Sequence, residues 1–422
     1  MIKVYGDIML DRWIYGSCDR VSPEAPILVM KEDNYNYSIG GAGNLATNLS
    51  SINDKVELYS CVADDKEGNK LQELLDKTKI KCYIDVNAEM TTTKTRFVGQ
   101  NGQQVMRWDR ERFYNEDTVI EKLIENLQSD DIVCISDYAK GTVKANTLQQ
   151  IFRKAKVLVD PKQDNYFYDG AFLVKPNMKE YVEWFGEFDE IDAGNIMRKH
   201  NWQWLVVTDG ANGMHVLSED SRYRHFKELT DQIVDVTGAG DTVLAVIAHG
   251  LSQGKDVFEA CEIACYAAAR AVERQGTTVI TSKDLKRKVT VWTNGVFDVL
   301  HKGHFELLKY ASKQGDKLIV GINSDTSVKR LKGETRPINN EIERKSQLES
   351  LPWVDQVVIF TDDTPLNKIK EYEPDIIVKG GDYSFDTVVG NTLAEVKIFP
   401  TVQGVSTTKT IGKINNDNIS KN

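Results

Sequence analysis

The sequence predicts an α/β protein of two unequal domains, each built on a largely parallel sheet covered by helices. Short apolar, β-branched runs alternate with amphipathic stretches of helical length, which is the pattern of strand–helix–strand units. The alternation starts afresh after a charged, polar stretch at residues 281–288. The length of 422 residues fits two to three domains at roughly 150 residues each. We therefore expect domains at residues 1–286 and 287–422.

Composition and charge limit the classes of protein that fit this chain. Hydrophobic residues make up 41% of the sequence and charged residues 27%, which is ordinary for a globular protein. The 53 lysines and arginines against 63 aspartates and glutamates give a formal net charge of −10. A general affinity for nucleic acid or for an anionic membrane is therefore not expected. Any phosphate ligand must be held by local positive groups.

The sequence carries no pattern typical of secretion, membrane insertion or zinc binding. Its six cysteines include no CxxC pair, which argues against a zinc ribbon and against a secreted disulfide framework. The N-terminal segment lacks the basic start and apolar region of a signal peptide. No apolar run approaches the ~18 residues that span a bilayer. We expect a cytoplasmic protein with no resident metal ion and no nucleic-acid or membrane partner.

Residue patterns predict the elements of each domain in order. In the first domain they predict strands at 56–61, 131–136, 156–160, 172–174 and 205–208, and helices at 121–128, 145–154 and 242–250. Residues 83–108 differ, because 91–98 and 104–108 flank a glycine-containing turn and predict an antiparallel hairpin, or small flap. In the second domain the patterns predict strands at 289–292, 318–322, 356–360 and 375–378, and a helix at 305–313.

The segment Asp-Val-Thr-Gly-Ala-Gly-Asp at residues 235–241 has the chemistry of phosphoryl transfer. It follows an apolar strand, and small residues at 238–240 let backbone N–H groups approach an anion at a helix N-terminus. Asp241 stands beside that anion site, where it can accept the proton of an attacking hydroxyl. The alternative is a structural turn in which Asp241 only caps the helix.

Other segments favour the catalytic interpretation of Asp241. Residues 40–48 form a second glycine-rich start of a helix, and the loop after the first strand carries the carboxylates of Asp7 and Asp11. Carboxylates and amides suit a ligand with many hydroxyl groups. Asn177 and Glu180 follow another strand and are placed to approach a metal–nucleotide complex.

Together these segments resemble the ribokinase-like sugar kinase family, whose signatures are GGxxxN and DTxGAGD. The resemblance implies a three-layer α/β domain with a small β-lid, ATP and Mg²⁺ as cofactors, Asp241 as base, and Gly238, Ala239 and Gly240 as the anion hole. It also implies a homodimer formed through the lid, here the 83–108 region. It assigns the sugar side to Asp7, Asp11, Gly41 and Asn44, and the nucleotide side to Asn177, Glu180, Asp209 and Gly210.

Three further segments of the first domain narrow the range of expected sugar substrates. Residues 21–26, 136–141 and 160–162 resemble segments of heptose-7-phosphate kinases. In that interpretation Lys140 and Lys162 bind the phosphate that the sugar already carries. The alternative for each of these lysines is an ordinary surface position.

A second motif opens the second domain. Residues 293–304 link a strand to a helix and hold two of the six histidines, His301 and His304. Imidazoles at a helix start can donate hydrogen bonds to phosphate oxygens and stabilise charge on a pentacoordinate phosphorus. The alternatives are capping histidines or a metal pair, but a metal site requires further ligands and none is conspicuous nearby.

This segment resembles the GxFDxxHxGH signature of the nucleotidylyltransferase superfamily, which implies a Rossmann-like domain. In that superfamily a nucleoside triphosphate is joined to a phosphate with release of pyrophosphate. The resemblance makes His301 and His304 catalytic, and it assigns the nucleotide to Gly295, Phe297, Lys332, Arg344, Gly381, Asp382, Ser406, Thr407 and Thr408.

The two resemblances occur in the order found in bifunctional heptose kinase/adenylyltransferases, which residues 336–339 and 378–383 also resemble. They imply phosphorylation of heptose 7-phosphate at the anomeric position and formation of ADP-heptose from heptose 1-phosphate. Residues 400–408 resemble glycerol-phosphate cytidylyltransferases, which keeps a CDP-activated product open. A sugar-nucleotide-binding regulator without activity is a third alternative, although a binding protein needs neither Asp241 nor the two histidines.

Overall fold

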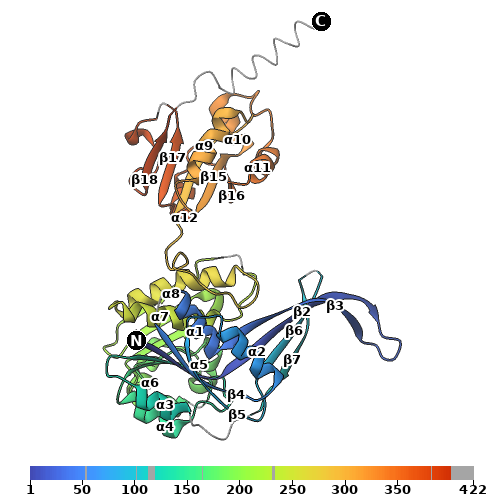
Figure 1. Ribbon diagram of the computed structural model, residues 1–422. Coiled ribbons are helices and arrows are strands. Elements are labelled where there is room, and N and C mark those ends of the chain that lie inside the picture. Colours follow the sequence, from blue (N-terminus) through green and yellow to red (C-terminus); the bar gives the residue numbers. More distant parts are fainter. Residues whose placement is uncertain are drawn as a thin grey trace. The chain divides into compact units, whose positions relative to one another are not determined.

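The computed structural model of the chain describes residues 1–52, 55–100, 102–112, 119–163, 165–230, 233–381 and 383–400. The chain divides into two compact units, Met1–Arg287 and Lys288–Asn422, which are described separately below (Figure 1). Among the described residues, no helix is both long and apolar enough to cross a membrane.

The first unit is built on a nine-stranded sheet with the order β13-β12-β11-β10-β9-β8-β1-β4-β5. Neighbouring strands from β11 to β5 pair in parallel, and β12 and β13 add an antiparallel edge. The carboxyl ends of the parallel strands therefore meet along one edge of the sheet, where α/β proteins bind their ligands. The strands are β1 (Ile2–Gly6), β4 (Val56–Ala63), β5 (Lys81–Ala88), β8 (Ile132–Ser136), β9 (Lys156–Asp160), β10 (Leu173–Val174), β11 (Trp204–Thr208), β12 (Met214–Ser218) and β13 (Tyr223–Phe226).

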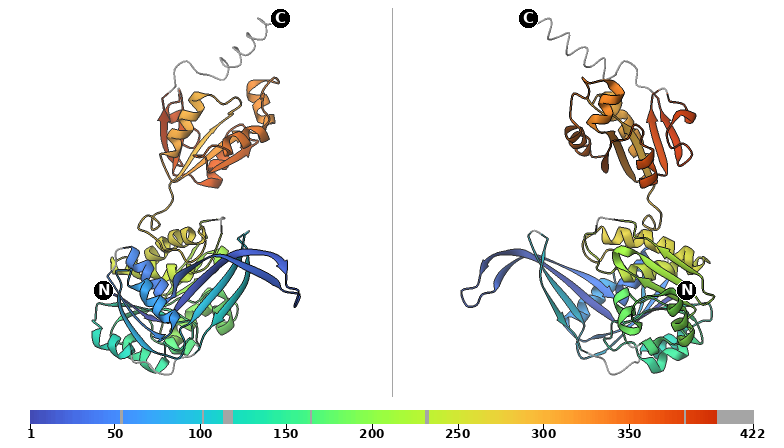
Figure 2. Two further views of the ribbon diagram at one scale, coloured as in Figure 1. Left: turned by 45° about the vertical axis from the view of Figure 1, so that its right-hand side comes forward. Right: turned by 180° about the vertical axis from the view of Figure 1, so that it is seen from behind.

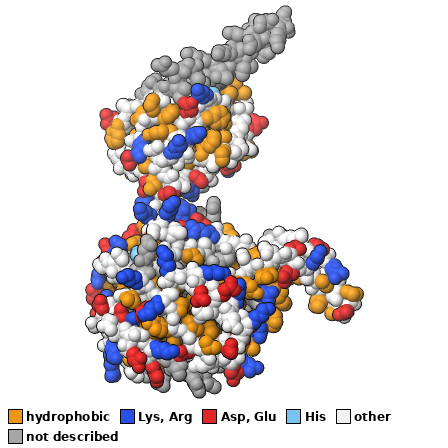
Figure 3. All heavy atoms as spheres, in the orientation of Figure 1, with side chains coloured by type: hydrophobic (Ala, Val, Ile, Leu, Met, Phe, Trp, Pro, Cys, Tyr) orange, Lys and Arg blue, Asp and Glu red, His pale blue; other side chains and the backbone are white. Residues whose placement is uncertain are grey.

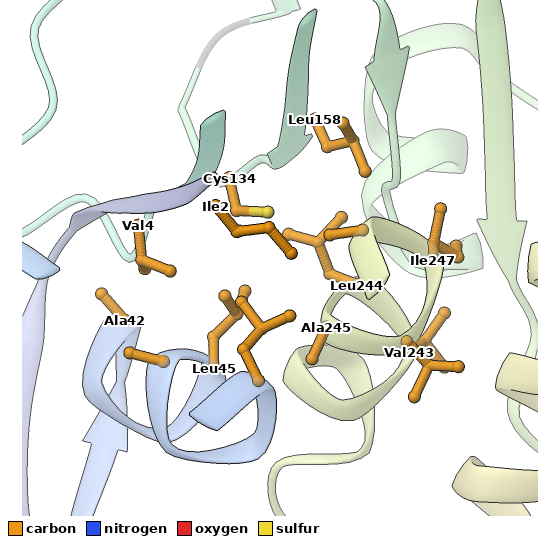
Figure 4. Packing of buried hydrophobic residues seen from close by; sticks show 14 of the residues in the cluster. Ile2, Val4, Ala42, Leu45, Cys134, Leu158, Val243, Leu244, Ala245 and Ile247 are labelled. Carbon is orange, nitrogen blue, oxygen red and sulfur yellow. The ribbon is translucent and has the colours of Figure 1, made fainter. Parts of the chain in front are cut away.

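Helices cover both faces of this sheet and give three layers. One apolar core joins the sheet to α1, α2, α7 and α8, and a second joins its other face to α3, α4, α5 and α6. In Figure 4, Leu45 of α1 and Leu244 of α7 approach Ile2 and Val4 of β1. The helices are α1 (Ala42–Ser51), α2 (Lys66–Leu75), α3 (Val119–Asn126), α4 (Ala145–Phe152), α5 (Met178–Phe185), α6 (Glu190–His200), α7 (Ala239–Ser252) and α8 (Val257–Val272), with short 3₁₀ turns at Asn165–Tyr168 and Gly210–Asn212.

A separate four-stranded sheet forms the lid, and it corrects the sequence-based prediction. Its order is β3-β2-β6-β7, and it extends away from the body of the unit (Figure 2). The expected hairpin is present as β6 and β7. Residues 81–88, however, belong to the main sheet. Residues 8–21 form a lid strand, although the sequence predicts a loop at their start. The lid strands are β2 (Ile8–Val21), β3 (Leu28–Gly41), β6 (Thr93–Gly99) and β7 (Gln104–Arg110).

The physical reason for this error is the mixed polarity of the lid strands. In β2 the buried Asp11 is neutralised by Arg96 of β6, so a charged residue stands inside a strand without exposure to water. In β3 half of the residues are exposed, and no apolar run marks the strand. A search for apolar runs therefore misses both strands, although pairing across the lid sheet satisfies their backbone groups.

The second unit contains a five-stranded parallel sheet with the order β16-β15-β14-β17-β18. The chain leaves β14 toward β15 and later returns to its other side as β17, so the strand order reverses between β14 and β17. Ligands of open α/β sheets bind at such a reversal. The elements are β14 (Thr290–Gly295), α9 (Lys302–Ser312), β15 (Lys317–Asn323), α10 (Asp325–Lys332), α11 (Glu341–Glu349), β16 (Gln356–Phe360), α12 (Leu366–Tyr372), β17 (Ile376–Gly380), a 3₁₀ turn at Phe385–Thr387, and β18 (Glu395–Phe399).

The packing of α7 against α8 generates a test of this fold. A Cβ atom at Gly250 of α7 would lie 2.7 Å from the Cβ of Ala260 in α8, whereas one at Gly194 of α6 would meet nothing within 4 Å. We expect Gly250→Ala to lower the free energy of unfolding of the first unit by about 1–3 kcal/mol through overpacking. The matched Gly194→Ala should leave it unchanged or raise it by up to about 1 kcal/mol, because alanine favours helix.

Urea denaturation of the two variants measures both effects on the same scale. Equal stability changes for the two substitutions would contradict the close packing of α7 on α8.

Two candidate active sites

The first unit contains a cavity of about 590 Å³ at the carboxyl ends of its parallel strands. Its walls come from the loops after β8, β9, β10 and β11, from the N-terminus of α7, and from the lid strand β6. Residues far apart in sequence therefore meet here, among them Lys94, Tyr138, Asp160, Lys175, Asn177, Glu180, Ala239 and Gly240.

Asp241 occupies the first turn of α7 and is almost completely buried. Its carboxylate accepts a hydrogen bond from Asn44 Nδ2 at 2.9 Å and from the hydroxyl of Tyr138 at 3.2 Å. Gly238 begins the helix in the left-handed conformation, with φ of 78°, and a Cβ there would lie 2.8 Å from Asn44 Nδ2. Glycine is required at 238 both for the backbone conformation and for this close approach.

The electrostatics of this site suit a base. Burial, together with the negative charge of Asp160, raises the pKa of Asp241 to about 7, against the opposing hydrogen bonds from Asn44 and Tyr138. Asp160 is paired with the buried Lys175, whose Nζ lies 3.0 Å from its Oδ1. A Cβ at Gly240 would lie 3.4 Å from both groups, so this ion pair lies directly beside the N-terminus of α7.

The residues expected on the sugar side have different tasks. Asp11 and Asn44 are buried, with Asp11 held by Arg96 Nη1 at 2.6 Å. The carboxylate of Asp7 accepts hydrogen bonds from the backbone N–H groups of residues 138, 140 and 142, so it shapes the loop after β8. None of the four residues predicted on the sugar side lines the cavity. Gly41 precedes α1 with φ of 59°.

The residues expected to bind the nucleotide or the sugar phosphate are largely engaged with one another. Asn177 and Glu180 form a reciprocal capping box at the start of α5, and both line the cavity. Lys162 Nζ lies 2.7 Å from Glu180 Oε1, and Lys140 Nζ lies 2.7 Å from Glu111 Oε2. Gly210 also lines the cavity, whereas Asp209, which accepts a hydrogen bond from Asn212, does not. Lys140 and Lys162 are therefore already neutralised.

Sequence reasoning missed Lys94 of β6. This half-buried side chain lines the cavity, and its Nζ lies 4.9 Å from the ring centroid of Tyr138. Among the residues that the structure describes, no carboxylate lies within ion-pair distance of Lys94, and burial lowers the pKa of its ammonium. The sequence feature that could have identified Lys94 is its place in the strand 93–99. Successive side chains of a strand point to opposite faces, so Lys94 and Arg96 share one face of the lid.

The second unit contains a cavity of about 250 Å³ where β14 and β17 end. The loop after β14 supplies Phe297, and the following helix begins with His301 as its N-cap. The imidazoles of His301 and His304 stack with ring centroids 3.7 Å apart, and the ring of Phe297 packs edge-on against His304 at 5.1 Å. The two histidines are therefore held as one unit at the start of α9.

Both imidazoles are kept neutral. Burial lowers the pKa of His301, and burial together with the neighbouring His301 lowers the pKa of His304 to about 4. Their Nδ1 atoms are buried and have no hydrogen-bond partner within the described part of the chain. Buried polar atoms are rarely left unpaired, so their presence at a cavity indicates a ligand.

Of the other residues expected to bind the nucleotide in the second unit, some line the cavity and others do not. Gly295, Phe297 and Gly381 line the cavity with the two histidines, whereas the exposed Lys332 at the end of α10 does not. Arg344 is fully buried and donates to the carbonyl of Val296 at 2.8 Å and to Asp325 at 2.7 Å. It supports the motif loop from behind and does not line the cavity. The remaining predicted residues, Asp382, Ser406, Thr407 and Thr408, lie outside the described residues.

Family models match both units. Residues 1–284 match the pfkB family of carbohydrate kinases, and residues 292–420 match the cytidylyltransferase-like family. The first unit also shares its fold with solved structures of low sequence identity. These are phosphofructokinase-2 from Escherichia coli (TM-score 0.58, 18% identity, 68% of this chain and 96% of that chain) and ribokinase from Thermotoga maritima (TM-score 0.55, 20% identity, 68% and 97%).

Relatives match the two units together, in one chain. The bifunctional protein HldE of Campylobacter fetus is 39% identical over 98% of this chain and 99% of its own length. HldE of a Nitratiruptor species is 38% identical, over 98% of each chain, and HldE of Pasteurella multocida is 37% identical, over 98% and 96%. These matches confirm the fold class and the bifunctional resemblance inferred from the motifs. The chain belongs to the HldE family of bifunctional proteins, with a carbohydrate kinase unit followed by a nucleotidyltransferase unit.

Proposed function

We propose that the first unit phosphorylates D-glycero-D-manno-heptose 7-phosphate at its anomeric hydroxyl, using ATP, and that the second unit converts heptose 1-phosphate to ADP-heptose. Membership in the HldE family supports both reactions. The observation that carries the kinase is the buried Asp241 at the N-terminus of α7, held by Asn44 and Tyr138. The first product carries two phosphates, so a phosphatase has to remove the 7-phosphate between the two reactions.

In the kinase reaction the anomeric oxygen attacks the γ-phosphorus of ATP. Asp241 accepts the proton of that hydroxyl, the new P–O bond forms, and the bond to the β-phosphate oxygen breaks with release of ADP. Backbone N–H groups at the start of α7 stabilise the negative charge on the transferred phosphoryl group. The buried ion pair of Lys175 with Asp160 adjoins Gly240 beside the same phosphoryl group.

In the second reaction an oxygen of the sugar 1-phosphate attacks the α-phosphorus of ATP. The new P–O–P linkage forms as the bond to the β-phosphate breaks, and pyrophosphate leaves. The neutral imidazoles of His301 and His304 donate hydrogen bonds to the triphosphate and stabilise charge on the pentacoordinate phosphorus. The observation that supports these roles is the pair of buried, unpartnered Nδ1 atoms beside the cavity.

Mg²⁺ fits as a companion of the nucleotide. The described residues contain no group of three or more histidine, cysteine or acidic side chains arranged to hold a metal ion. Glu180 lines the kinase cavity and supplies one carboxylate on the nucleotide side. Mg²⁺ in such sites is bound mostly by phosphates and water, with one or two protein carboxylates.

We further propose that the protein is a cytoplasmic homodimer joined through the lid. The exposed apolar side chains of Leu28, Tyr35, Val105 and Trp108 on the lid strands support this association. The six cysteines are free, which suits a reducing compartment. CTP stays an alternative nucleotide for the second unit, because the family model that matches it is described as cytidylyltransferase-like.

Replacing Asp241 tests the kinase assignment. Asp241→Asn keeps the shape of the side chain but removes the base, so we expect ADP release from ATP and heptose 7-phosphate to fall by about 10²–10⁴-fold. Pyrophosphate release from ATP and heptose 1-phosphate should stay at the wild-type rate, because that reaction belongs to the other unit. In the wild type, kcat/KM for the sugar should decrease as the pH is lowered below 7, because protonated Asp241 cannot accept a proton.

The kinase assignment fails if the wild type releases no ADP or if Asp241→Asn retains full activity. A kcat/KM that stays level down to pH 5 would contradict Asp241 as the base.

Replacing Lys94 tests how the kinase recognises a substrate that already carries a phosphate. Lys94 is a cation without an ion-pair partner among the described residues. We therefore expect Lys94→Met to raise KM for heptose 7-phosphate about 10–100-fold, which is the effect of losing one hydrogen bond to a charged group. KM for ATP should change less than about threefold. Lys154→Met removes an exposed lysine after α4 and serves as the control. An effect confined to the KM for ATP would refute this role.

Replacing His304 tests the nucleotidyltransferase. We expect His304→Asn to lower the rate of pyrophosphate release by about 10²–10³-fold, since a hydrogen-bond donor to the transition state is lost. ADP release by the kinase in the same preparation should be unchanged, which would show that the loss is confined to the second unit. Assays with CTP in place of ATP identify the nucleotide, and wild-type turnover with CTP alone would establish the cytidylyl alternative.

A further inference from the structure

Lys379 is a charged residue of the second cavity that has no role in the proposed nucleotidyltransferase reaction. It lies at the end of β17, next to Asn294 of β14 across the point where the strand order reverses. Its side chain is 8% exposed, and its Nζ donates a hydrogen bond to the carbonyl of Asn294 at 3.0 Å. The ammonium therefore enters the cavity from the strand beside the one that leads to the histidines.

The surroundings of Lys379 leave its charge unbalanced. Among the described residues that line the cavity, Lys379 carries the only full charge, since both histidines are neutral and none is acidic. No carboxylate in the described ranges lies within ion-pair distance of its Nζ, which lies 5.3 Å from the ring centroid of Tyr383. One of the three ammonium N–H groups is used by Asn294, which leaves two for a ligand. A buried charge without a partner is costly, so the arrangement calls for an anion.

We propose that Lys379 binds the phosphate of the sugar 1-phosphate, the group that attacks the nucleotide. This inference rests on the proposed nucleotidyltransferase activity. Two anions meet in this cavity, and the triphosphate already has the N-terminus of α9 and the two imidazoles. Among the described residues that line the cavity, Lys379 is the charged donor left for the acceptor phosphate. A cation there also offsets the repulsion between an attacking phosphate and the α-phosphate.

Steady-state kinetics of Lys379→Met test the proposal. We expect KM for heptose 1-phosphate to rise at least tenfold, KM for ATP to change less than threefold, and Lys379→Arg to recover part of the loss. Lys397→Met is the matched control, because this lysine of β18 pairs with Glu395 and does not line the cavity. A rise only in KM for ATP, or no change in either KM, overturns the proposal. A KM for ATP in the same reaction that stays within threefold of the wild type reports that the second unit is folded.

The pH dependence supplies a second readout that a purely structural lysine would not give. Burial lowers the pKa of Lys379 to about 8, so its ammonium is present below pH 8 and is lost above it. The titratable groups that face it in the described structure are His301, His304 and Tyr383. We expect the wild-type KM for heptose 1-phosphate to rise above pH 8 and that of Lys379→Arg to stay level to pH 9.5. Parallel profiles for the two proteins overturn the proposal.

A binding measurement separates this proposal from the proposed function. If the wild type releases no pyrophosphate, the nucleotidyltransferase assignment fails, and calorimetric titration with heptose 1-phosphate still tests Lys379. Tenfold weaker binding to Lys379→Met than to wild type supports the site, and equal binding refutes it.

Discussion

The burial of the Asp241 carboxyl group at the N-terminus of α7 is the constraint on which the first unit depends. Three separate elements have to meet around it: Asn44 from α1, Tyr138 from the loop after β8, and Gly238 at the start of α7 itself. Asp7 fixes the loop that carries Tyr138, and the apolar core between α1, α7 and the sheet fixes the two helices (Figure 4). A carboxyl placed in this way has a pKa of about 7, which suits proton transfer near neutral pH.

The two sites bind anions by the same physical means although the chain is acidic. Each lies where parallel strands end and a helix begins, so backbone N–H groups face the ligand. A buried lysine adjoins each site: Lys175, paired with Asp160, in the first unit, and Lys379 in the second. Basic and acidic side chains are interspersed over the face of the first unit drawn in Figure 3. Phosphate binding therefore depends on a few buried groups, and the net charge of −10 does not oppose it.

Local motifs were predictable because their chemistry lies within a few consecutive residues. The segment 293–304 places a strand end, a glycine-containing loop and a helix start together, as predicted. The strand predicted before 235–241 is absent among the described residues, since β13 ends at Phe226, and the segment leads from a loop into α7. Residues of both segments line the cavities. The ion pairs of Lys140 with Glu111 and of Lys162 with Glu180 could not be predicted, because the partners are not neighbours in sequence. Lys94 escaped notice because only the folded lid brings it to Tyr138.

The sequence by itself determined the order of the two units and their fold classes, since these follow from short patterns and their spacing. Tertiary structure alone decided which charges are already neutralised. Asp11 is held by Arg96 and Arg344 by Asp325, whereas Lys94 and Lys379 have no ion-pair partner among the described residues. The reason is that an ion pair forms between side chains close in space, and distance along the chain says little about that closeness.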